Sequence, residues 1–345
     1  MTISIYDPRS MAAALKQMPP ARSFLKQLFF GGASKTHTTE SFDVDIQTEG
    51  RRAAEFSNPK GPGKAVDRTG FSTETFRPPM VAPKMSITVE DMQTRLPGEH
   101  IYAEKDPDSR AAELLGGDIA LLDSMIVRRE EIMARDALVD GEIVCTGDDY
   151  AQTITFPARD ASLTIGTLAA AKRWDAGTSD PIRDIRDWRR AIDALTGLSA
   201  DKLILGSTAL DALLANTSVQ TLLDNRRMDM GQLAPGLLNG GATYYGRLGG
   251  VDIWGYDELD ADGNPLVSVK SALLGCTAAR CEMHYGPVGV ASGDGNAARI
   301  TLVPAARVPE SWVEREPAVR WVKISSRPLP VPIQNNAFLT ATVLA

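Results

Sequence analysis

The sequence predicts an α+β fold organised around one long helix. Residues 108–138 carry apolar side chains every three or four positions, which is the spacing of one buried helix face. Shorter segments on both sides alternate apolar and polar residues, as half-buried strands do. In contrast, residues 51–97 contain too few apolar residues to form a core of their own. A segment without a core needs another molecule to lie against, and this favours assembly over catalysis.

The bulk composition is that of a folded protein with one large or two modest domains. The chain has 345 residues, of which 43% are hydrophobic and 23% charged. Its net charge of −7 disfavours nucleic-acid binding by the whole surface. Three cysteines without a C-x-x-C pair indicate buried thiols in a reducing compartment. No run reaches the roughly 20 apolar residues of a membrane helix, and no secretory signal opens the chain. We therefore expect folding in a cytoplasm.

The first residues predict an arm that packs on the body or on a neighbouring molecule. Ala12 to Met18 favours a short helix that is ended by Pro19. The apolar run from Ser23 to Phe30 would aggregate alone in water, so something must cover it. Residues 41–47 then alternate cleanly and predict a half-buried strand.

The segment from Arg51 to Pro97 predicts two strand-like runs joined by a basic, flexible tip. Asn58 to Lys64 is rich in proline and glycine and cannot form a helix. Phe71 to Phe76 is a second β-prone run, closed by Pro78. Residues 51–84 hold seven basic and three acidic residues, a net charge of +4.

The long helix is predicted over about residues 108–138. Asp106-Pro107 is a start signal, with acidic residues at the positive end of the helix dipole. Gly116-Gly117 is its weak point, since each glycine costs about 1 kcal/mol relative to alanine. Residues 106–140 hold nine acidic and four basic residues, a net charge of −5. The basic segment 51–84 and the acidic helix have two interpretations. They pair between neighbouring molecules and so set how the molecules align, or they are ordinary solvated surfaces.

The rest of the chain predicts a mixed α/β region followed by β structure. Prolines 328, 330 and 332 indicate a sheet edge or a crossover. The expected elements are two strands within 142–156, an amphipathic helix over 181–195, a buried strand over 202–205, a helix over 208–214 capped by Ser207, two strands within 243–256, strand structure within 273–285 and β structure from 312 to 343.

Four local patterns are typical of one protein family. Arg51 to Phe56 matches the start of the family's extended loop, and Phe76 to Lys84 matches its end. Arg95 to Glu99, followed by Asp106-Pro107, matches the approach to its long helix, and Pro328 to Leu344 matches its C-terminal part. With the order of the parts, these patterns make the chain resemble the lambda-type major capsid proteins of tailed bacteriophages, the phage major capsid protein E family.

The resemblance implies the tailed-phage major capsid fold, with an N-terminal arm, an extended β-loop, a long spine helix, a peripheral domain and an axial domain. The implied divisions are residues 1–40 for the arm, 41–105 for the first strand and extended loop, 106–175 for the spine helix and peripheral domain, completed by 307–345, and 176–306 for the axial domain.

The resemblance also implies a structural protein that is not an enzyme and needs no cofactor. Copies of the chain would assemble into the pentamers and hexamers of an icosahedral head that encloses packaged DNA without sequence-specific binding. Assembly would occur in the host cytoplasm and give the virion capsid. About 40 residues before the extended loop leave no room for a built-in scaffolding segment. A separate scaffolding protein is therefore implied, with a portal and a head decoration protein as further partners.

Contacts between subunits are expected at two places. The resemblance implies that the extended loop lies over the next subunit of the same capsomer, and the charge pattern favours a contact at the acidic face of the spine helix. Glu130 and Glu131 are expected on the exposed side of this helix, with Glu131 paired to Arg135. The expected contact residues are Arg51, Arg52, Phe56, Lys60, Lys64, Arg68, Phe71, Phe76 and Arg77 in the loop, and Asp118, Asp123 and Glu130 in the helix.

Some members of related families crosslink a loop lysine to an asparagine of a neighbouring subunit. In this chain the reaction would join Lys60 or Lys64 to Asn335 or Asn336. It also needs a buried acid to accept a proton, and no such acid is identifiable from the sequence. We therefore expect a non-covalent shell.

Motifs for catalysis or metal binding are weak. Gly31 to Thr36 lacks the glycine that precedes the lysine of a P-loop. Asp260 to Asn264 begins like a calcium loop but lacks its final glutamate, so a hairpin turn is expected. Gly286 to Gly295 lacks the order of a nucleotide site and is expected to be a mobile loop. Wide separation in the sequence favours structural roles for the histidines, which are His37, His100 and His284.

Two other functions stay open. An encapsulin-like nanocompartment shell protein resembles the same fold, and a purified shell that carries an enzyme and no portal would favour it. A soluble enzyme or binding module with its site in the α/β middle region would form a small oligomer and would be stabilised by its ligand.

Overall fold

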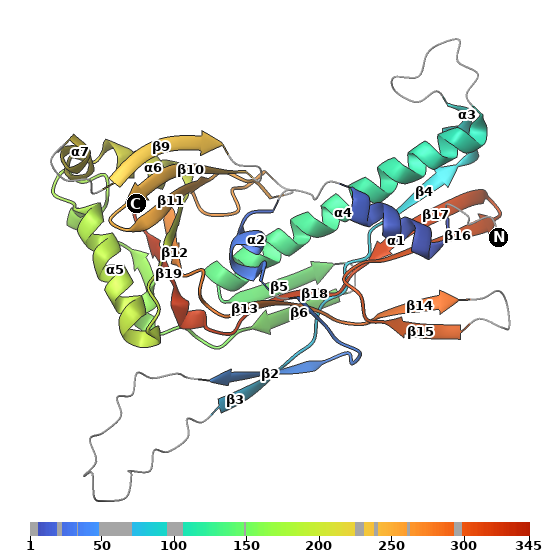
Figure 1. Cartoon of the computed structure of the whole chain (residues 1–345), viewed down its shortest axis with the longest axis horizontal. Helices are drawn as coiled ribbons and strands as arrows, with labels where there is room; N and C mark the ends of the chain where they lie inside the picture. The colour runs from blue at the N-terminus through green and yellow to red at the C-terminus, as the bar shows by residue number, and fades with distance from the viewer. Residues whose placement is uncertain are drawn as a thin grey trace, which may run out of the picture.

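The structure is a computed structural model of the chain. It describes residues 6–18, 23–32, 34–47, 71–94, 106–147, 150–224, 231–237, 241–260, 263–292 and 299–345. Figure 1 shows an elongated subunit with a broad sheet and its helices at one end, a long diagonal helix, and small sheets and hairpins along that helix. The mixture of helices and strands agrees with the predicted α+β class.

Helix α4 (Pro107–Val139) is the spine of the subunit and lies close to its predicted bounds. Its 33 residues span about 50 Å at ~1.5 Å per residue. One face buries Leu115, Ile119 and Ile126 against the neighbouring sheet and the first helix. The helix continues without a break through Gly116-Gly117, because helical hydrogen bonding does not require a side chain there.

The N-terminal helices pack on the body of their own subunit. Helices α1 (Pro8–Gln17) and α2 (Leu25–Phe30) both contact α4 (Figure 1). Met11 of α1 joins the core beside the spine, whereas Leu25 joins the core near the large sheet. The apolar run predicted to need a cover therefore finds that cover within the subunit.

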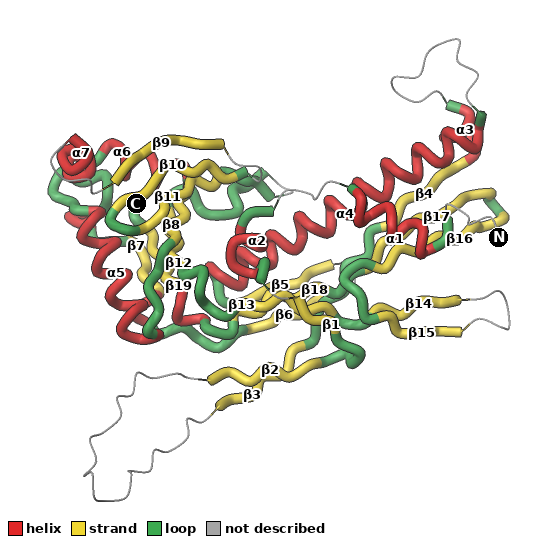
Figure 2. Tube along the Cα trace, viewed as in Figure 1, coloured by secondary structure: helices red, strands yellow, loops and turns green. Residues whose placement is uncertain are grey.

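Small sheets and hairpins flank the spine helix, and Figure 2 shows them in yellow along its length. The prolines of β18 lie at a sheet edge, as predicted. The expected mobile loop after Gly286 is wrong in its first part, because Val288 to Ser292 pairs with a second strand. These elements are β1 (Ser34–Thr36), β13 (Cys281–Tyr285) and β18 (Pro328–Pro332) in one sheet, β4 (Lys84–Thr88), β16 (Val308–Arg315) and β17 (Ala318–Ser325) in another, the hairpins β5 (Glu142–Gly147) with β6 (Tyr150–Thr155) and β14 (Val288–Ser292) with β15 (Arg299–Val303), and the short helix α3 (Val89–Gln93).

Strands β2 (Phe42–Gln47) and β3 (Phe71–Phe76) lie where the sequence predicts strands, and they pair with each other as an antiparallel ribbon. In Figure 1 the ribbon leads away from the small sheets into open space. The tip that would join these strands, residues 48–70, lies outside the described part of the chain.

The large sheet has the strand order β7–β19–β12–β8–β11–β10–β9 and is flanked by helices (Figure 1). Its core contains Trp174, Trp188 and Leu203. Its elements are β7 (Thr164–Thr167), β8 (Lys202–Leu205), β9 (Gly231–Leu237), β10 (Ala242–Leu248), β11 (Val251–Tyr256), β12 (Ser271–Gly275), β19 (Phe338–Thr342), the helices α5 (Pro181–Thr196), α6 (Ser207–Ala215) and α7 (Thr217–Asp224), and the 3₁₀ turns over Ala161–Leu163, Ala170–Lys172 and Asn335–Ala337.

The sheet pairings cross the divisions that the resemblance implies. Strand β19 pairs with β12 in the large sheet, so the C-terminal end does not complete only the sheets beside α4. Strand β13 pairs with β1 and β18 beside α4, although the division assigns it to the axial part. The sequence did not reveal that β13 and β19 pair outside their assigned parts, because tertiary packing determines which strands become partners.

Two local predictions have clear outcomes. Ser207 is the first residue of α6 and not its cap, because Gly206 occupies the cap position. A side chain at Gly206 would collide with the backbone of Ser268 and Val269, which explains the glycine. The predicted hairpin turn is confirmed, since Asp260 accepts a hydrogen bond from the backbone N–H of Asn264.

Candidate functional site

The β2–β3 ribbon is rooted in the core of its own subunit. Phe42 and Phe76 are cross-strand partners at the end of the ribbon nearest the body, and their ring centroids lie 6.2 Å apart. The ring of Phe76 also lies 5.5 Å from that of Phe156. Residues 72–75, farther along the ribbon, are exposed. The root is therefore apolar and enclosed, whereas the described part beyond it meets solvent on β3.

Arg327 holds both legs of the ribbon. Its Nε and Nη2 atoms donate hydrogen bonds of 3.1 and 2.9 Å to the carbonyl oxygen of Pro78, just after β3. Its Nη2 atom also lies 3.8 Å from the carboxylate of Glu40, just before β2. Glu40 forms a second ion pair with Arg77. One guanidinium thus fixes the points at which the chain leaves the body and returns to it.

Two histidines that are 247 positions apart meet beside this root. Nε2 of His37 lies 2.8 Å from Nδ1 of His284. The ring of Phe42 stacks on both, at centroid distances of 4.2 and 4.5 Å. The two histidines are far apart in the sequence but adjacent in space, and their packing agrees with the predicted structural roles. His100 lies outside the described residues.

Glu130 of the spine helix is the centre of a buried charge network. Arg307 donates from Nη1 and Nη2 to its two carboxylate oxygens, at 2.7 and 3.0 Å. Lys26 of α2 donates at 2.6 Å and the hydroxyl of Tyr285 at 3.2 Å. Burial alone would raise the pKa of Glu130, but Arg307 and Lys26 hold it below its ordinary value. The network ties α2, β13 and the start of β16 to the spine.

Glu131 caps the start of helix α2. Its carboxylate accepts hydrogen bonds of 2.7 to 3.0 Å from the backbone N–H groups of Phe24, Leu25 and Lys26. It also accepts one of 2.8 Å from the hydroxyl of Tyr256 on β11. A carboxylate is well placed at a helix N-terminus, where N–H groups lack helical partners. Glu131 therefore joins α2 and the large sheet to the spine.

The acidic contact face expected on the spine helix is largely wrong. Glu130 and Glu131 are 0% and 3% exposed, so neither lies on the outer side of the helix. Glu131 does not pair with Arg135, which binds Asp136 and Asp140 instead. Both glutamates bind partners from segments that are distant in the sequence. The apolar spacing of one helix carries no information about such partners.

Two predicted helix contacts keep some access to solvent. Asp123 accepts a 2.7 Å hydrogen bond from Nε of Arg307, so part of its charge is used within the subunit. Asp118 is half-buried, and burial followed by the charge of Asp91 raises its pKa. Asp118 and Asp123 do not form a continuous acidic stripe with the buried Glu130.

The predicted loop contacts divide into four groups. Phe76 is only 4% exposed and belongs to the root, so its expected place on an outer contact surface is wrong. Arg77 is exposed but already paired with Glu40. Phe71 begins β3 as the backbone partner of Gln47. The others lie outside the described residues, and they are Arg51, Arg52, Phe56, Lys60, Lys64 and Arg68.

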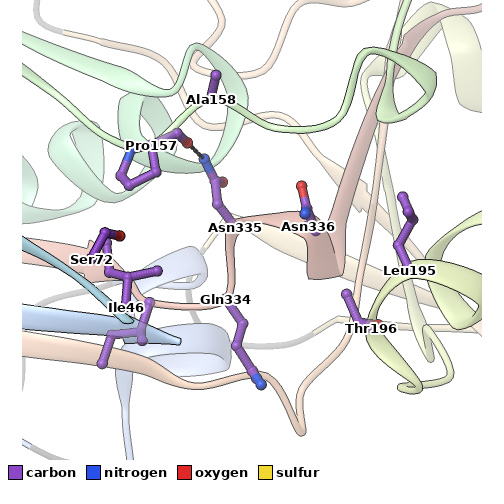
Figure 3. Close-up of a pocket in the computed structure, with 10 residues that line it drawn as sticks. Ile46, Ser72, Pro157, Ala158, Leu195, Thr196, Gln334, Asn335 and Asn336 are labelled. Carbon is purple, nitrogen blue, oxygen red and sulfur yellow. Dashed lines mark hydrogen bonds between the residues drawn. The ribbon is translucent and has the colours of Figure 1, made fainter. Parts of the chain in front are cut away.

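A polar cavity of about 170 Å³ lies between the ribbon, the end of α5 and the turn before β19. Figure 3 shows Asn335 and Asn336 on its wall. Asn335 donates to the carbonyl of Pro157 at 2.7 Å and accepts from Nε of Arg159 at 2.9 Å. The side-chain oxygen of Asn336 accepts from the backbone N–H of Asp160. Both amides thus support the fold, and the lysines once considered for a crosslink lie outside the described residues.

Sequence reasoning missed two exposed apolar surfaces. Leu121 and Met125, one helical turn apart on α4, are 51% and 52% exposed. Ile300 and Leu302, on one face of β15, are 83% and 59% exposed. The i, i+4 spacing of the first pair was visible in the sequence, but the stripe through Leu122 and Ile126 already accounted for the core.

Catalytic and metal chemistry finds little support in the described part of the chain. No group of three or more histidine, cysteine and acidic side chains there is arranged to hold a metal ion. Cys276 and Cys281 are buried, as predicted, whereas Cys145 is half-buried. Burial raises the pKa of Cys281 to about 12, so it stays a thiol. No helix among the described residues is both long and apolar enough to span a membrane.

Comparison with known proteins agrees with the fold. The chain is 26% identical over 351 residues to a prophage-derived major head protein of Escherichia coli CFT073, covering 99% of this chain and 100% of that protein. It is 25% identical over 348 residues to the major capsid protein of Escherichia phage lambda, covering 98% and 99%. A crystal structure of a prophage protein from E. coli CFT073 superimposes over the full length of both chains, with a TM-score of 0.70 and 20% identity.

These likenesses cover the spine, the ribbon and the large sheet together. The tailed-phage capsid fold is therefore the fold of the whole subunit and not of one part. The sequence also matches the family named phage major capsid protein E over residues 7–343. This chain belongs to the phage major capsid protein E family.

Proposed function

We propose that this chain is the coat subunit of a phage head and that it assembles by laying its β2–β3 ribbon, together with residues 48–70 that join the two strands, on the next subunit. The observation that carries this proposal is the ribbon itself, which has a fixed root and an outer part with exposed side chains. An isolated two-stranded ribbon is only marginally stable in water. A neighbouring subunit would supply the missing packing surface.

The supports of the root favour this role. Phe42 and Phe76 bury their rings in the subunit, and Arg327 holds Pro78 and Glu40 at the two ends of the ribbon. A rigid root gives the ribbon a defined direction, which reduces the entropy lost when it binds. The basic residues of segment 51–84 would then fix how the ribbon aligns on an acidic surface of the neighbouring subunit.

The test is a subunit in which the segment between β2 and β3 is shortened. Deletion of residues 55–80 would be a poor choice because it removes β3 and the buried ring of Phe76. Replacing residues 51–68 by a short Gly-Ser linker leaves both strands and the root in place. We expect this variant to fold with an unchanged circular dichroism spectrum but to form no shells or rings.

A matched control keeps the length of the segment between β2 and β3 and changes only the order of its residues. Scrambling residues 57–65 preserves length and charge and should leave assembly nearly intact, since that tip is expected to act as a flexible connection. Normal shells from the shortened variant would contradict the proposed contact of residues 51–68 with the next subunit.

The finer assembly follows from the same proposal. Head-to-tail contacts between copies are heterologous, and they close into rings when the rotation permits. We infer pentamers and hexamers, an icosahedral shell around packaged DNA, and a separate scaffolding protein, portal and head decoration protein. Co-expression of the chain with its neighbouring genes, followed by mass spectrometry of purified particles, tests these partners.

We also infer that the chain does not act as an enzyme. The family to which it belongs is a structural one, and this supports a phage coat over a soluble enzyme. The matches to a major head protein and to a phage major capsid protein support the phage head over a nanocompartment. Particles that contain a portal and DNA would agree with the phage head, whereas particles filled with an enzyme would favour the nanocompartment.

A further inference from the structure

The root of the ribbon contains a histidine pair that the assembly role alone does not require. His37 follows β1 and His284 belongs to β13, so the pair joins two strands from opposite ends of the chain. Phe42, the first residue of β2, stacks on both rings at interplanar angles of 6° and 11°. The first residue of the ribbon is therefore stacked on two imidazole rings.

The hydrogen bond within the pair depends on the number of protons. Nε2 of His37 and Nδ1 of His284 face each other at 2.8 Å, so one must donate and the other accept. A neutral pair or a singly protonated pair can satisfy this arrangement. When both rings are protonated, two N–H groups face each other and the hydrogen bond is lost.

The surroundings of the pair disfavour added positive charge. His284 is 3% exposed, and Lys35 lies close by with its ammonium group 2.6 Å from Glu282. Burial lowers the pKa of His284 to about 4, with Glu282 opposing the shift and His37 and Lys35 adding to it. Burial followed by the charge of Lys35 also lowers the pKa of His37.

Glu282 compensates this charge only in part. Its carboxylate oxygen lies 3.2 Å from Nε2 of His284 and opposes the lowering of the pKa of His284. The same oxygen lies 2.6 Å from the ammonium group of Lys35, so its charge is shared between the two. Three further charged groups at the root are paired, since Glu40 binds both Arg77 and Arg327. Asp43, next to Phe42 on β2, accepts a hydrogen bond from the hydroxyl of Thr75. The root therefore has no acid reserved for a second imidazolium among its described residues.

We propose that the His37–His284 pair is a proton-sensitive positioning element that fixes the direction of the ribbon and releases its root on acidification. The pair holds Phe42, and Phe42 holds Phe76 across the two strands. Loss of the hydrogen bond between the imidazoles weakens the stacking that holds Phe42, and with it the contact between Phe42 and Phe76. The consequence for assembly rests on the proposed role of the ribbon, whereas the loosening of the root does not.

The first experiment measures hydrogen exchange of the unassembled full-length subunit between pH 7 and pH 4. The open root releases the imidazoles to solvent, where the pKa of each returns to its ordinary value of 6.5. Opening then takes up at least one proton, so protection of the β2 and β3 amides should fall at least about tenfold per pH unit between about pH 6.5 and about pH 4. Amides of α4 in the same samples report any general acid effect.

A double substitution keeps the hydrogen bond and removes the proton sensitivity. In His37→Gln with His284→Asn, the glutamine amide nitrogen replaces Nε2 as a donor and the asparagine oxygen replaces Nδ1 as an acceptor. We expect the β2 and β3 protection in this variant to be independent of pH beyond the change seen in α4. An equal slope in the native chain and this variant would overturn the proposal.

Two single substitutions predict shifts of opposite sign. Lys35→Gln removes a positive charge and raises the histidine pKa values of the closed root, so the fall in protection should end at a higher pH and be smaller. Glu282→Gln removes a negative charge and lowers these pKa values, so the fall should continue to a lower pH and be larger. A merely structural role for these side chains would not move the transition in opposite directions, and shifts of the same sign would contradict the proposal.

Assembly gives the second measurement. Shell yield of the native chain, followed by light scattering and negative-stain microscopy, should fall over the pH range in which the root loosens, and the double variant should retain its yield. If the root loosens in the native subunit but both chains assemble equally well, the positioning element is supported and the assembly role of the ribbon is contradicted.

Discussion

Glu130 on the spine helix and Arg307 before β16 form a buried ion pair with two hydrogen bonds, at 2.7 and 3.0 Å. The glutamate is completely buried. The pair joins the middle of the spine to the point at which the chain returns for its last sheets. It is a contact within one subunit, so it prepares the subunit for assembly and does not itself join two copies.

Removing one partner of this pair should destabilise the isolated subunit strongly. Arg307→Met leaves Glu130 buried with only Lys26 as a cation, and breaking such a pair costs about 3 to 5 kcal/mol. Urea unfolding of the subunit measures the loss. The exposed Arg315→Met is the matched control and should change stability by less than about 0.5 kcal/mol. Equal stability of both variants would show that the pair contributes little.

The same pair predicts a pH dependence of stability. The pKa of Glu130 lies below its ordinary value of 4.5 in the folded subunit. The unfolded chain therefore binds the proton more readily, so the stabilisation is present above pH 4.5 and is lost as the pH falls below it. In Arg307→Met, burial should raise the pKa of Glu130, and the stability deficit should shrink on acidification. Urea unfolding at pH 7 and pH 4 compares the two chains, and a constant deficit would contradict this explanation.

Glu131 should control the order of helix α2. Glu131→Ala removes the acceptor of three backbone N–H groups, whereas Tyr256→Phe removes only one donor to the same carboxylate. We expect a cost of about 1 kcal/mol for Tyr256→Phe and several times this for Glu131→Ala. Hydrogen exchange of residues 24–30 measures the local effect, which should be large only in Glu131→Ala. Unchanged exchange there would mean that α2 is held mainly by its apolar side chains.

The two central glycines of the spine should be replaceable. A side-chain carbon at Gly116 or Gly117 meets no atom within 4 Å. Alanine at each position should stabilise the isolated subunit by about 1 kcal/mol, since glycine is a poor helix former. Thermal unfolding measures this gain.

If these glycines serve as a flexible point during assembly, the double alanine variant should also change shell size or maturation, as seen by electron microscopy. A more stable subunit that forms normal shells would remove this role. A less stable subunit would show that the helix is strained at this point.

The sequence predicted the regular elements well because they depend on local patterns. The spine helix and strand β2 follow from apolar spacing alone. Glu130 shows where pattern reading stopped too early. It lies four residues after Ile126 and three before Met133, and so on the buried face. A charged residue within an apolar stripe was a visible signal of a buried partner.

The remaining features depend on contacts between distant segments. His37 and His284 meet only because β1 lies parallel to β13. Strand β19 enters the large sheet beside β12, which no local pattern encodes. The exposed face of Ile300 and Leu302 follows a glycine-rich stretch that favoured a loop. Tertiary pairing decided each of these outcomes, and a single sequence does not record it.

The most direct test of the central claim is negative-stain electron microscopy, with light scattering, of the full chain and of the variant in which a Gly-Ser linker replaces residues 51–68. The full chain, expressed alone or with its neighbouring genes, should give closed shells or five- and six-fold rings, and the variant should give folded monomers. A full chain that stays monomeric or dimeric under every condition, or a variant that forms normal shells, would contradict the account.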